Sequence, residues 1–169
     1  MNSIRTTLFA TLLTIVVTPA FAQSEAEFKK NCTRMCAEVV KAFNSKSIAW
    51  FQNNSTSDFV YIDAKGTKSP KKDALAGMGQ MFQMAKSVKA TIKCGAMTWK
   101  NGVGTHANTM TSTIVMVGPD KKPHTMVQVV ESVDTYKKVK GKWLISQVKE
   151  TKPAKTTMDG KPFNPEGGM

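Results

Sequence analysis

The stretch from His124 to Thr151, HTMVQVVESVDTYKKVKGKWLISQVKET, decides the fold. Its side chains alternate with a period of two over many residues, which is typical of β-strands and not of a helix. Lys140, Gly141 and Lys142 interrupt the alternation as a turn, so the stretch predicts two long strands in a hairpin. Because both alternating sets contain apolar residues, both faces are at least partly covered. Helices must therefore lie on one face.

The segments before this hairpin predict the covering helices and the remaining strands. An apolar stripe with helical spacing runs from Phe28 to Phe43, behind a capping box formed by Ser24 and Glu27. The predicted elements are helices over 24–44 and 45–52, a strand over 58–63, a helix over 69–88, strands over 89–100 and 105–117, and the hairpin. Consecutive antiparallel strands preceded by helices indicate an α+β domain.

The two ends of the chain are expected to lie outside this domain. Residues 1–22 are predicted to be a secretory signal peptide, because Arg5 precedes an apolar run of about ten residues that is too short to span a bilayer. Cleavage after Ala22 would place the mature chain in the periplasm or outside the cell, with no transmembrane span. The domain then covers residues 23–152, and residues 153–169, rich in proline and glycine, are predicted to be a disordered tail.

The charge argues against nucleic acid as a partner. The chain has 24 Lys+Arg against 12 Asp+Glu, a net charge of +12, and its arginines are Arg5 and Arg34 alone. Proteins that read nucleic-acid sequence favour arginine, whose planar fork matches bases and phosphates. The lysines indicate a solvated surface, and attraction to an anionic partner of the cell envelope is the alternative.

Three cysteines remain in the predicted mature chain. Cys32 and Cys36 lie one helical turn apart, with Cβ atoms about 5–6 Å apart, whereas a disulfide needs about 3.8 Å. In an oxidising compartment we expect Cys94 to pair with one of them, and we choose Cys36–Cys94. A copper(I) site with Met35 beside the two thiols is the alternative. Methionine at helical spacing is more typical of core packing, and neither histidine has metal-ligand spacing, so we expect no metal and no other cofactor.

Two local patterns carry a resemblance to a known family. The first is DFVYIDAKG over 58–66, followed by the helix start at 72–75. The second is DTYKKVKGKWLI over 134–145, a strand, a glycine turn and a last strand that carries tryptophan. Residues 24–151 thereby resemble the nuclear-transport-factor-2-like superfamily, and within it the SnoaL-like and ketosteroid-isomerase-like proteins. The resemblance implies a strongly curved antiparallel sheet wrapped around N-terminal helices, a cystatin-like cone with a pocket at its open end.

The pocket implied by this fold has several candidate residues. Asp134 or His106 could act as a base, and Tyr61 or Tyr136 as a hydrogen-bond donor to a developing oxyanion. If Trp143 faces the helices, strand alternation places Gln147 on the same face. The predicted ligand-binding residues are Gln147, Gln128, Trp143, Tyr136 and Asn108. Each candidate also fits an ordinary structural role, so the sequence predicts an inventory and not a catalytic constellation.

Several functions are compatible with such a domain. The resembling family contains isomerases, dehydratases, cyclases, scaffolding subunits and small-ligand binders, and fold does not select among them. An apolar pocket with few titratable groups favours binding of a small apolar molecule, or scaffolding without catalysis. The alternatives are a metal-free proton-transfer enzyme of the isomerase, dehydratase or cyclase type, and a cationic envelope-interaction protein. Val127 and Val129 share one face of their strand, which predicts a homodimer through the sheet.

Overall fold

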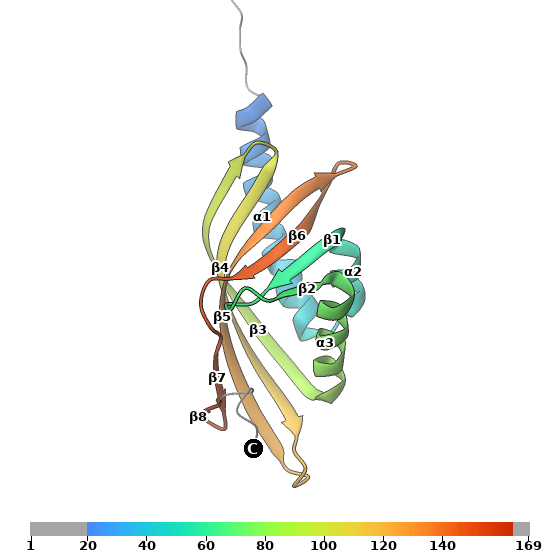
Figure 1. Ribbon diagram of the computed structural model, residues 1–169, viewed down its shortest axis with the longest axis vertical. Coiled ribbons are helices and arrows are strands. Elements are labelled where there is room, and N and C mark those ends of the chain that lie inside the picture. Colours follow the sequence, from blue (N-terminus) through green and yellow to red (C-terminus); the bar gives the residue numbers. More distant parts are fainter. Residues whose placement is uncertain (1–19, 164–169) are drawn as a thin grey trace, which may run out of the picture.

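A curved sheet wraps around a long helix in the computed structural model, which describes residues 20–163 (Figure 1). The elements are α1 (Ala20–Asn44), α2 (Ile48–Asn54), β1 (Ser55–Ile62), β2 (Lys68–Pro70), α3 (Lys71–Met84), β3 (Ala85–Lys100), β4 (Val103–Val117), β5 (Pro123–Val139), β6 (Lys142–Glu150), β7 (Lys155–Met158) and β8 (Lys161–Pro162). The predicted α+β class and the curvature of the sheet are confirmed. The third helix ends at Met84, earlier than predicted, and Val88 belongs to β3.

The strands follow the order β2-β1-β6-β5-β4-β3 across the sheet. All pairs along this path are antiparallel except β1 with β6, which are parallel. The sheet is therefore mixed and not wholly antiparallel as expected. The difference arises because β1 precedes α3 in the chain yet joins the sheet beside its last long strand, in the same direction.

The predicted turns between the long strands are confirmed. Lys140 and Gly141 join β5 to β6 with φ angles of 49° and 80°. Asn101 and Gly102 join β3 to β4 with φ angles of 52° and 78°. Positive φ at both central residues is the geometry of a type I′ turn, whose twist matches that of the flanking strands.

Local irregularities in strand pairing add bends to the sheet. In β3 the register shifts between Cys94 and Met97, which pair with Asn108 and His106, so β3 carries one extra residue. In β6 the register shifts where Tyr136 pairs with Ile145. A β-bulge of this kind bends its strand and increases the local twist. The bulges therefore help the long strands to curve around α1.

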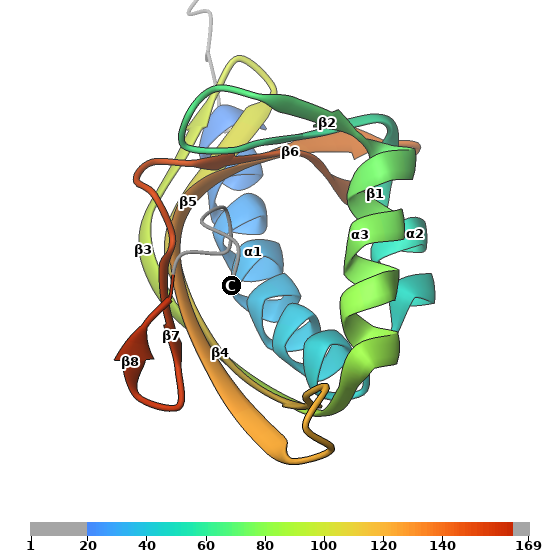
Figure 2. The same ribbon diagram turned by 60° about the horizontal axis from the view of Figure 1, so that its bottom comes forward.

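The helix α1 lies inside the curve of the sheet (Figure 2). Near its N-terminal end Phe28, 1% exposed, packs against the rings of Trp99, Tyr136 and Trp143, with ring centroids 5.3–5.9 Å away. We call this group the aromatic cluster. A second core forms at the other end of α1, where α2 and α3 meet the sheet; its buried members are Ala42, Phe43, Phe51, Phe82, Ala85, Val88, Ala90 and Ile114.

The ends of the domain differ from expectation. The backbone of α1 is helical from Ala20, ahead of the predicted cap at Ser24. The predicted signal peptide lies mostly outside the described residues. Residues 155–158, within the predicted disordered tail, form β7, which pairs with β5 beyond the end of β6. Free backbone groups on that edge of β5 account for the pairing. Among the described helices, none is long and apolar enough to cross a membrane.

The contact between α1 and β4 predicts a strong effect of one methyl group. A Cβ added at Gly104 would lie 2.2 Å from Cε2 of Phe28, whereas one added at Gly77 in α3 would meet nothing within 4 Å. We expect Gly104→Ala to lower the free energy of unfolding by about 1–3 kcal/mol through overpacking. The matched control Gly77→Ala should raise it by about 0.5–1 kcal/mol. Urea denaturation measures both, and equal effects would contradict the packing described.

Candidate functional site

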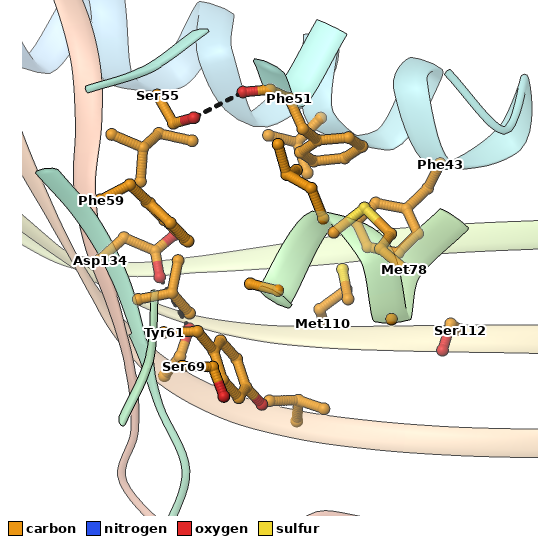
Figure 3. Close-up of a pocket in the computed structure, with 18 of the residues that line it drawn as sticks. Phe43, Phe51, Ser55, Phe59, Tyr61, Ser69, Met78, Met110, Ser112 and Asp134 are labelled. Atoms are coloured by element: carbon orange, nitrogen blue, oxygen red, sulfur yellow. Dashed lines mark hydrogen bonds between the residues drawn. The ribbon is translucent and has the colours of Figure 1, made fainter. Parts of the chain in front are cut away.

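A cavity of about 470 Å³ lies between the helices and the concave face of the sheet (Figure 3). This volume is within the range of small-molecule sites, about 300–1,000 Å³. Most of its wall is apolar; the apolar lining residues are Val39, Phe43, Phe51, Phe59, Ala74, Leu75, Met78, Met81, Ile92, Met110, Val130, Ile145 and Val148. The polar groups that reach it gather mainly on β1, β4 and β5.

The helix α3 forms one wall of the cavity. Its N-terminal turn carries Asp73, a favourable place for a carboxylate because the helix dipole is positive there. Ala74, Met78 and Met81 follow at spacings of four and three, so they share the face that lines the cavity. Methionine at helical spacing is typical of core packing. Flexible thioether side chains also suit a wall that adapts to a bound molecule.

Asp134 on β5 is the most prominent polar group of the cavity. Its Oδ1 accepts a hydrogen bond from Oγ of Ser132 at 2.9 Å, and its Oδ2 accepts one from Nδ2 of Asn108 at 2.9 Å. The three residues come together because Asn108 on β4 pairs with Ser132, and Asp134 follows two residues later on the same face. The pair of donors fixes the orientation of the carboxyl group in the cavity wall.

The surroundings of Asp134 change its acidity. Burial raises the pKa of the Asp134 carboxyl to about 6, although the hydrogen bond from Ser132 and the electrostatic influence of His106 act in the opposite direction. Asp134 retains some accessible surface, because it faces a cavity that water-sized molecules can enter. An enclosed carboxyl that changes charge near neutral pH is able to hold or release a proton under physiological conditions.

Tyr61 lines the cavity, but its hydroxyl group already has a partner. It donates a hydrogen bond to Oε1 of Glu150 on β6, and Oε2 of Glu150 accepts a bond from the backbone N–H of Ala64. Burial, followed by the interaction with Glu150, raises the pKa of Tyr61. The hydroxyl is therefore engaged in holding β1 to β6, which argues against the predicted role as an oxyanion donor. Glu150 was not among the predicted site residues.

The structure divides the predicted site residues into two groups. Asp134, Tyr61, Gln128 and Asn108 line the cavity. The other four residues, Gln147, Trp143, Tyr136 and His106, do not line it.

Gln147 misses the cavity because of the bulge in β6. Tyr136 pairs with Ile145 whereas Thr135 pairs with Gln147, so Ser146 is an extra residue in that strand. Beyond it the alternation is inverted, and Val148, not Gln147, lines the cavity. Simple alternation from Trp143 therefore predicts the wrong face.

Trp143, Tyr136 and His106 are buried next to the cavity and not in its wall. Trp143 and Tyr136 are 3% and 2% exposed in the aromatic cluster. His106 is 1% exposed, and its Nδ1 faces Sγ of Cys36 at 3.8 Å. It is therefore not placed to act as a base on a molecule in the cavity.

The cysteines do not form the expected disulfide. Cys32, Cys36 and Cys94 are all free thiols in the structure, which therefore does not contain the predicted Cys36–Cys94 bond. The thiols of Cys36 and Cys94 nonetheless interact: burial and then the neighbouring Cys36 raise the pKa of Cys94 to about 11. Cys94 is exposed at the start of the bulge in β3, whereas Cys36 is buried on α1.

The acidity of Asp134 predicts a measurable pH dependence. Its folded-state pKa of about 6 exceeds the ordinary value of 3.8, so between these values the folded chain holds a proton that the unfolded chain has lost. Stability from this group therefore falls as pH rises through that interval, by up to roughly 3 kcal/mol. The Asp134→Asn variant should lack this pH-dependent part of the free energy of unfolding, which urea denaturation at several pH values measures. Carbon-13 NMR of the Asp134 carboxyl should give a midpoint near 6; a midpoint near 4 would refute the assignment.

Comparison with known proteins identifies the fold but no activity. No protein-family model matches the sequence, and neither does any curated protein. Among solved structures, a protein from Novosphingobium aromaticivorans described as a "putative scytalone dehydratase" gives a TM-score of 0.67 at 12% identity, covering 88% of this chain and 99% of that chain. A conserved protein from Planctomyces limnophilus gives 0.64 at 10% identity, covering 78% and 99%.

A third solved structure supplies a name for the architecture. An uncharacterized protein with a cystatin-like fold from Caulobacter vibrioides gives a TM-score of 0.51 at 10% identity, covering 81% of this chain and 91% of that chain. Likeness at such low identity shows the fold alone. The chain has the cystatin-like α+β fold that its resemblance to the nuclear-transport-factor-2-like superfamily predicts.

Proposed function

We propose that this chain is an exported domain that binds a small, mostly apolar molecule in the cavity between α3 and the sheet. The observation that carries the proposal is an apolar cavity of about 470 Å³ with a hydrogen-bonded carboxyl group, Asp134, in its wall. Sites for small molecules commonly combine an apolar lining with a few oriented polar groups. Export is part of the proposal and is supported by the N-terminal sequence.

The polar groups favour a ligand that carries a hydrogen-bond donor. Each oxygen of Asp134 accepts one bond from the protein, and an ionised carboxylate oxygen has a further lone pair to offer. Gln128 also lines the cavity and brings a side-chain amide, which can both donate and accept. We therefore infer a ligand with an apolar body and a hydroxyl or enol group directed at Asp134.

Two tryptophan substitutions on one helix test this proposal. Ala74 faces the cavity, whereas Ala76 is exposed and does not line it. We expect Ala74→Trp to fill the cavity and weaken binding of the neutral fluorescent probe N-phenyl-1-naphthylamine at least about tenfold, a loss of about 1.4 kcal/mol. Ala76→Trp, the matched control, should bind as the wild type does. Circular dichroism establishes that both variants fold, and equal binding by the two would contradict the proposed site.

The outer face of the sheet supports the expectation of a homodimer. Gln128 points into the cavity, so Val127 and Val129, its neighbours on β5, point to the opposite face. Together with threonines of β4 that pair with them, they form a partly buried, weakly polar surface. A second copy of the chain packing on this face would leave the cavity accessible, because the cavity lies on the other side.

A proton-transfer enzyme is the second candidate, and the acidity of Asp134 favours it. A carboxyl group with a pKa of about 6 in an apolar cavity is suited to act as a general base near neutral pH. The structural neighbour described as a putative scytalone dehydratase supports the same reaction class by analogy of fold alone. Tyr61 is engaged with Glu150, so the donor to an oxyanion would be a different group of the cavity wall, such as Gln128 or Ser112.

Isotope exchange separates binding from catalysis. Native mass spectrometry first identifies any small molecule that co-purifies with the wild-type chain. If Asp134 moves protons, that molecule incubated with the protein in deuterated water should gain deuterium at carbon, and Asp134→Asn should abolish the gain while the cavity still binds the molecule. Exchange at the same rate with wild type, variant and buffer would exclude the enzyme and leave the binding proposal intact.

A further inference from the structure

A second cluster of chemically active side chains lies outside the cavity, between α1 and β4. Cys32 and Cys36 occupy successive turns of α1, and His106 faces them from near the start of β4. Their ligand atoms, two sulfurs and an imidazole nitrogen, all lie within 4.8 Å of one another. The sulfur of Cys36 is 3.8 Å from Nδ1 of His106. The three groups therefore converge on one point.

Packing places this cluster in a dry environment. Cys32 and His106 are each 1% exposed and Cys36 is 7% exposed. The aromatic cluster, together with Met35, surrounds the thiols. Nε2 of His106 is buried without a hydrogen-bond partner among the described residues. The other ring nitrogen, Nδ1, faces the sulfur of Cys36 and is the one placed to ligate an ion shared with the thiols.

The thiol of Cys36 is poorly suited to catalysis. Cys32 and burial raise the pKa of the Cys36 thiol to about 12, and His106 lowers it only in part. A thiol that keeps its proton is a weak nucleophile, so a cysteine–histidine catalytic pair is disfavoured. A disulfide between Cys32 and Cys36 is also disfavoured, because neighbouring turns of a helix hold the Cβ atoms too far apart.

The geometry and charge of the cluster instead suit a metal ion. Ligand atoms of a tetrahedral zinc site lie about 3.5–3.8 Å apart, given Zn–S of about 2.3 Å and Zn–N of about 2.0 Å. The sulfur of Cys36 and Nδ1 of His106 lie 3.8 Å apart, close to the sulfur–nitrogen spacing of about 3.5 Å in such a site. Two thiolates and a neutral imidazole carry two negative charges, which a divalent cation cancels. Neutrality matters here because an uncompensated charge in a buried site is costly.

We propose that Cys32, Cys36 and His106 bind one zinc ion, which fastens the helix α1 to the strand β4. Binding replaces the thiol protons: the ion forms two Zn–S bonds and one Zn–N bond, and each ligating thiol releases its proton to solvent. No change of oxidation state is involved. The ion would lie next to the contact between Phe28 and Gly104 and would stabilise the same helix–sheet junction. The proposal does not depend on ligand binding in the cavity.

Metal titration of the full mature chain tests the inference. Under a phosphine reductant, the wild type should bind one equivalent of zinc in competition with a chromophoric chelator, release protons, and unfold at a higher temperature when zinc is present. Cobalt(II) as a substitute should give the near-ultraviolet absorption of thiolate–cobalt charge transfer. Absence of that absorption in the wild type would overturn the proposal without any variant.

The two histidines provide a matched pair of variants. His106→Gln should weaken zinc binding by at least about tenfold, whereas His124→Gln, which removes a partly exposed histidine paired with Asp120 and Asp159, should leave it unchanged. Cys36→Ser should reduce the thiolate–cobalt absorption, because one of the two thiolate ligands is lost. Equal zinc affinity in both histidine variants, or binding of copper(I) without any binding of zinc, would contradict the assignment.

Discussion

The contact between the ring of Phe28 and the backbone of Gly104 is the constraint on which the structure depends. A side chain at residue 104 would occupy the space that the ring fills, so only glycine lets α1 approach the sheet this closely. The ring sits among Trp99, Tyr136 and Trp143 and holds the N-terminal half of α1 against the two hairpins. With the helix fixed there and a second core at its other end, the concave surface between the two cores remains open as a cavity.

This arrangement places two kinds of chemistry on successive residues of the same strand face. Along β4, Gly104 receives Phe28, His106 meets the thiols, and Asn108 orients Asp134 in the cavity. The electrostatic influence of His106 reaches Asp134, its partner across β4 and β5. The helix junction and the cavity are therefore neighbours in one sheet. A change of charge on His106 affects the carboxyl group of Asp134.

Much of the fold could be predicted because it rests on local patterns. Alternation predicted the long strands, and the residue pairs Asn101-Gly102 and Lys140-Gly141 predicted the turns that join them. The candidate site was predicted less completely. Asp134 and Asn108 were predicted correctly because β4 pairs with β5 without a bulge, so the alternation of inward and outward side chains is not interrupted. Gln147 was assigned to the wrong face because one extra residue in β6 inverts the alternation of its side chains. No residue type in that strand indicates the bulge.

Other features could not be predicted because they depend on contacts between distant parts of the chain. His106 lies 70 residues from Cys36, so no ligand spacing exists in the sequence to reveal their approach. Glu150 was missed for the same reason, since its partner Tyr61 lies 89 residues away. In each case the sheet brings the groups together through strand pairing, and the register of that pairing is a property of the whole fold.

The most direct test of this account is the proximity of Phe28 and Gly104 in solution, measured by NMR on the folded chain. We predict strong nuclear Overhauser effects between the ring protons of Phe28 and the Hα protons of Gly104, with the latter shifted upfield by the ring current. Sharp Phe28 signals without these effects, at chemical shifts typical of an exposed ring, would show that α1 does not lie in the curve of the sheet and would contradict the account.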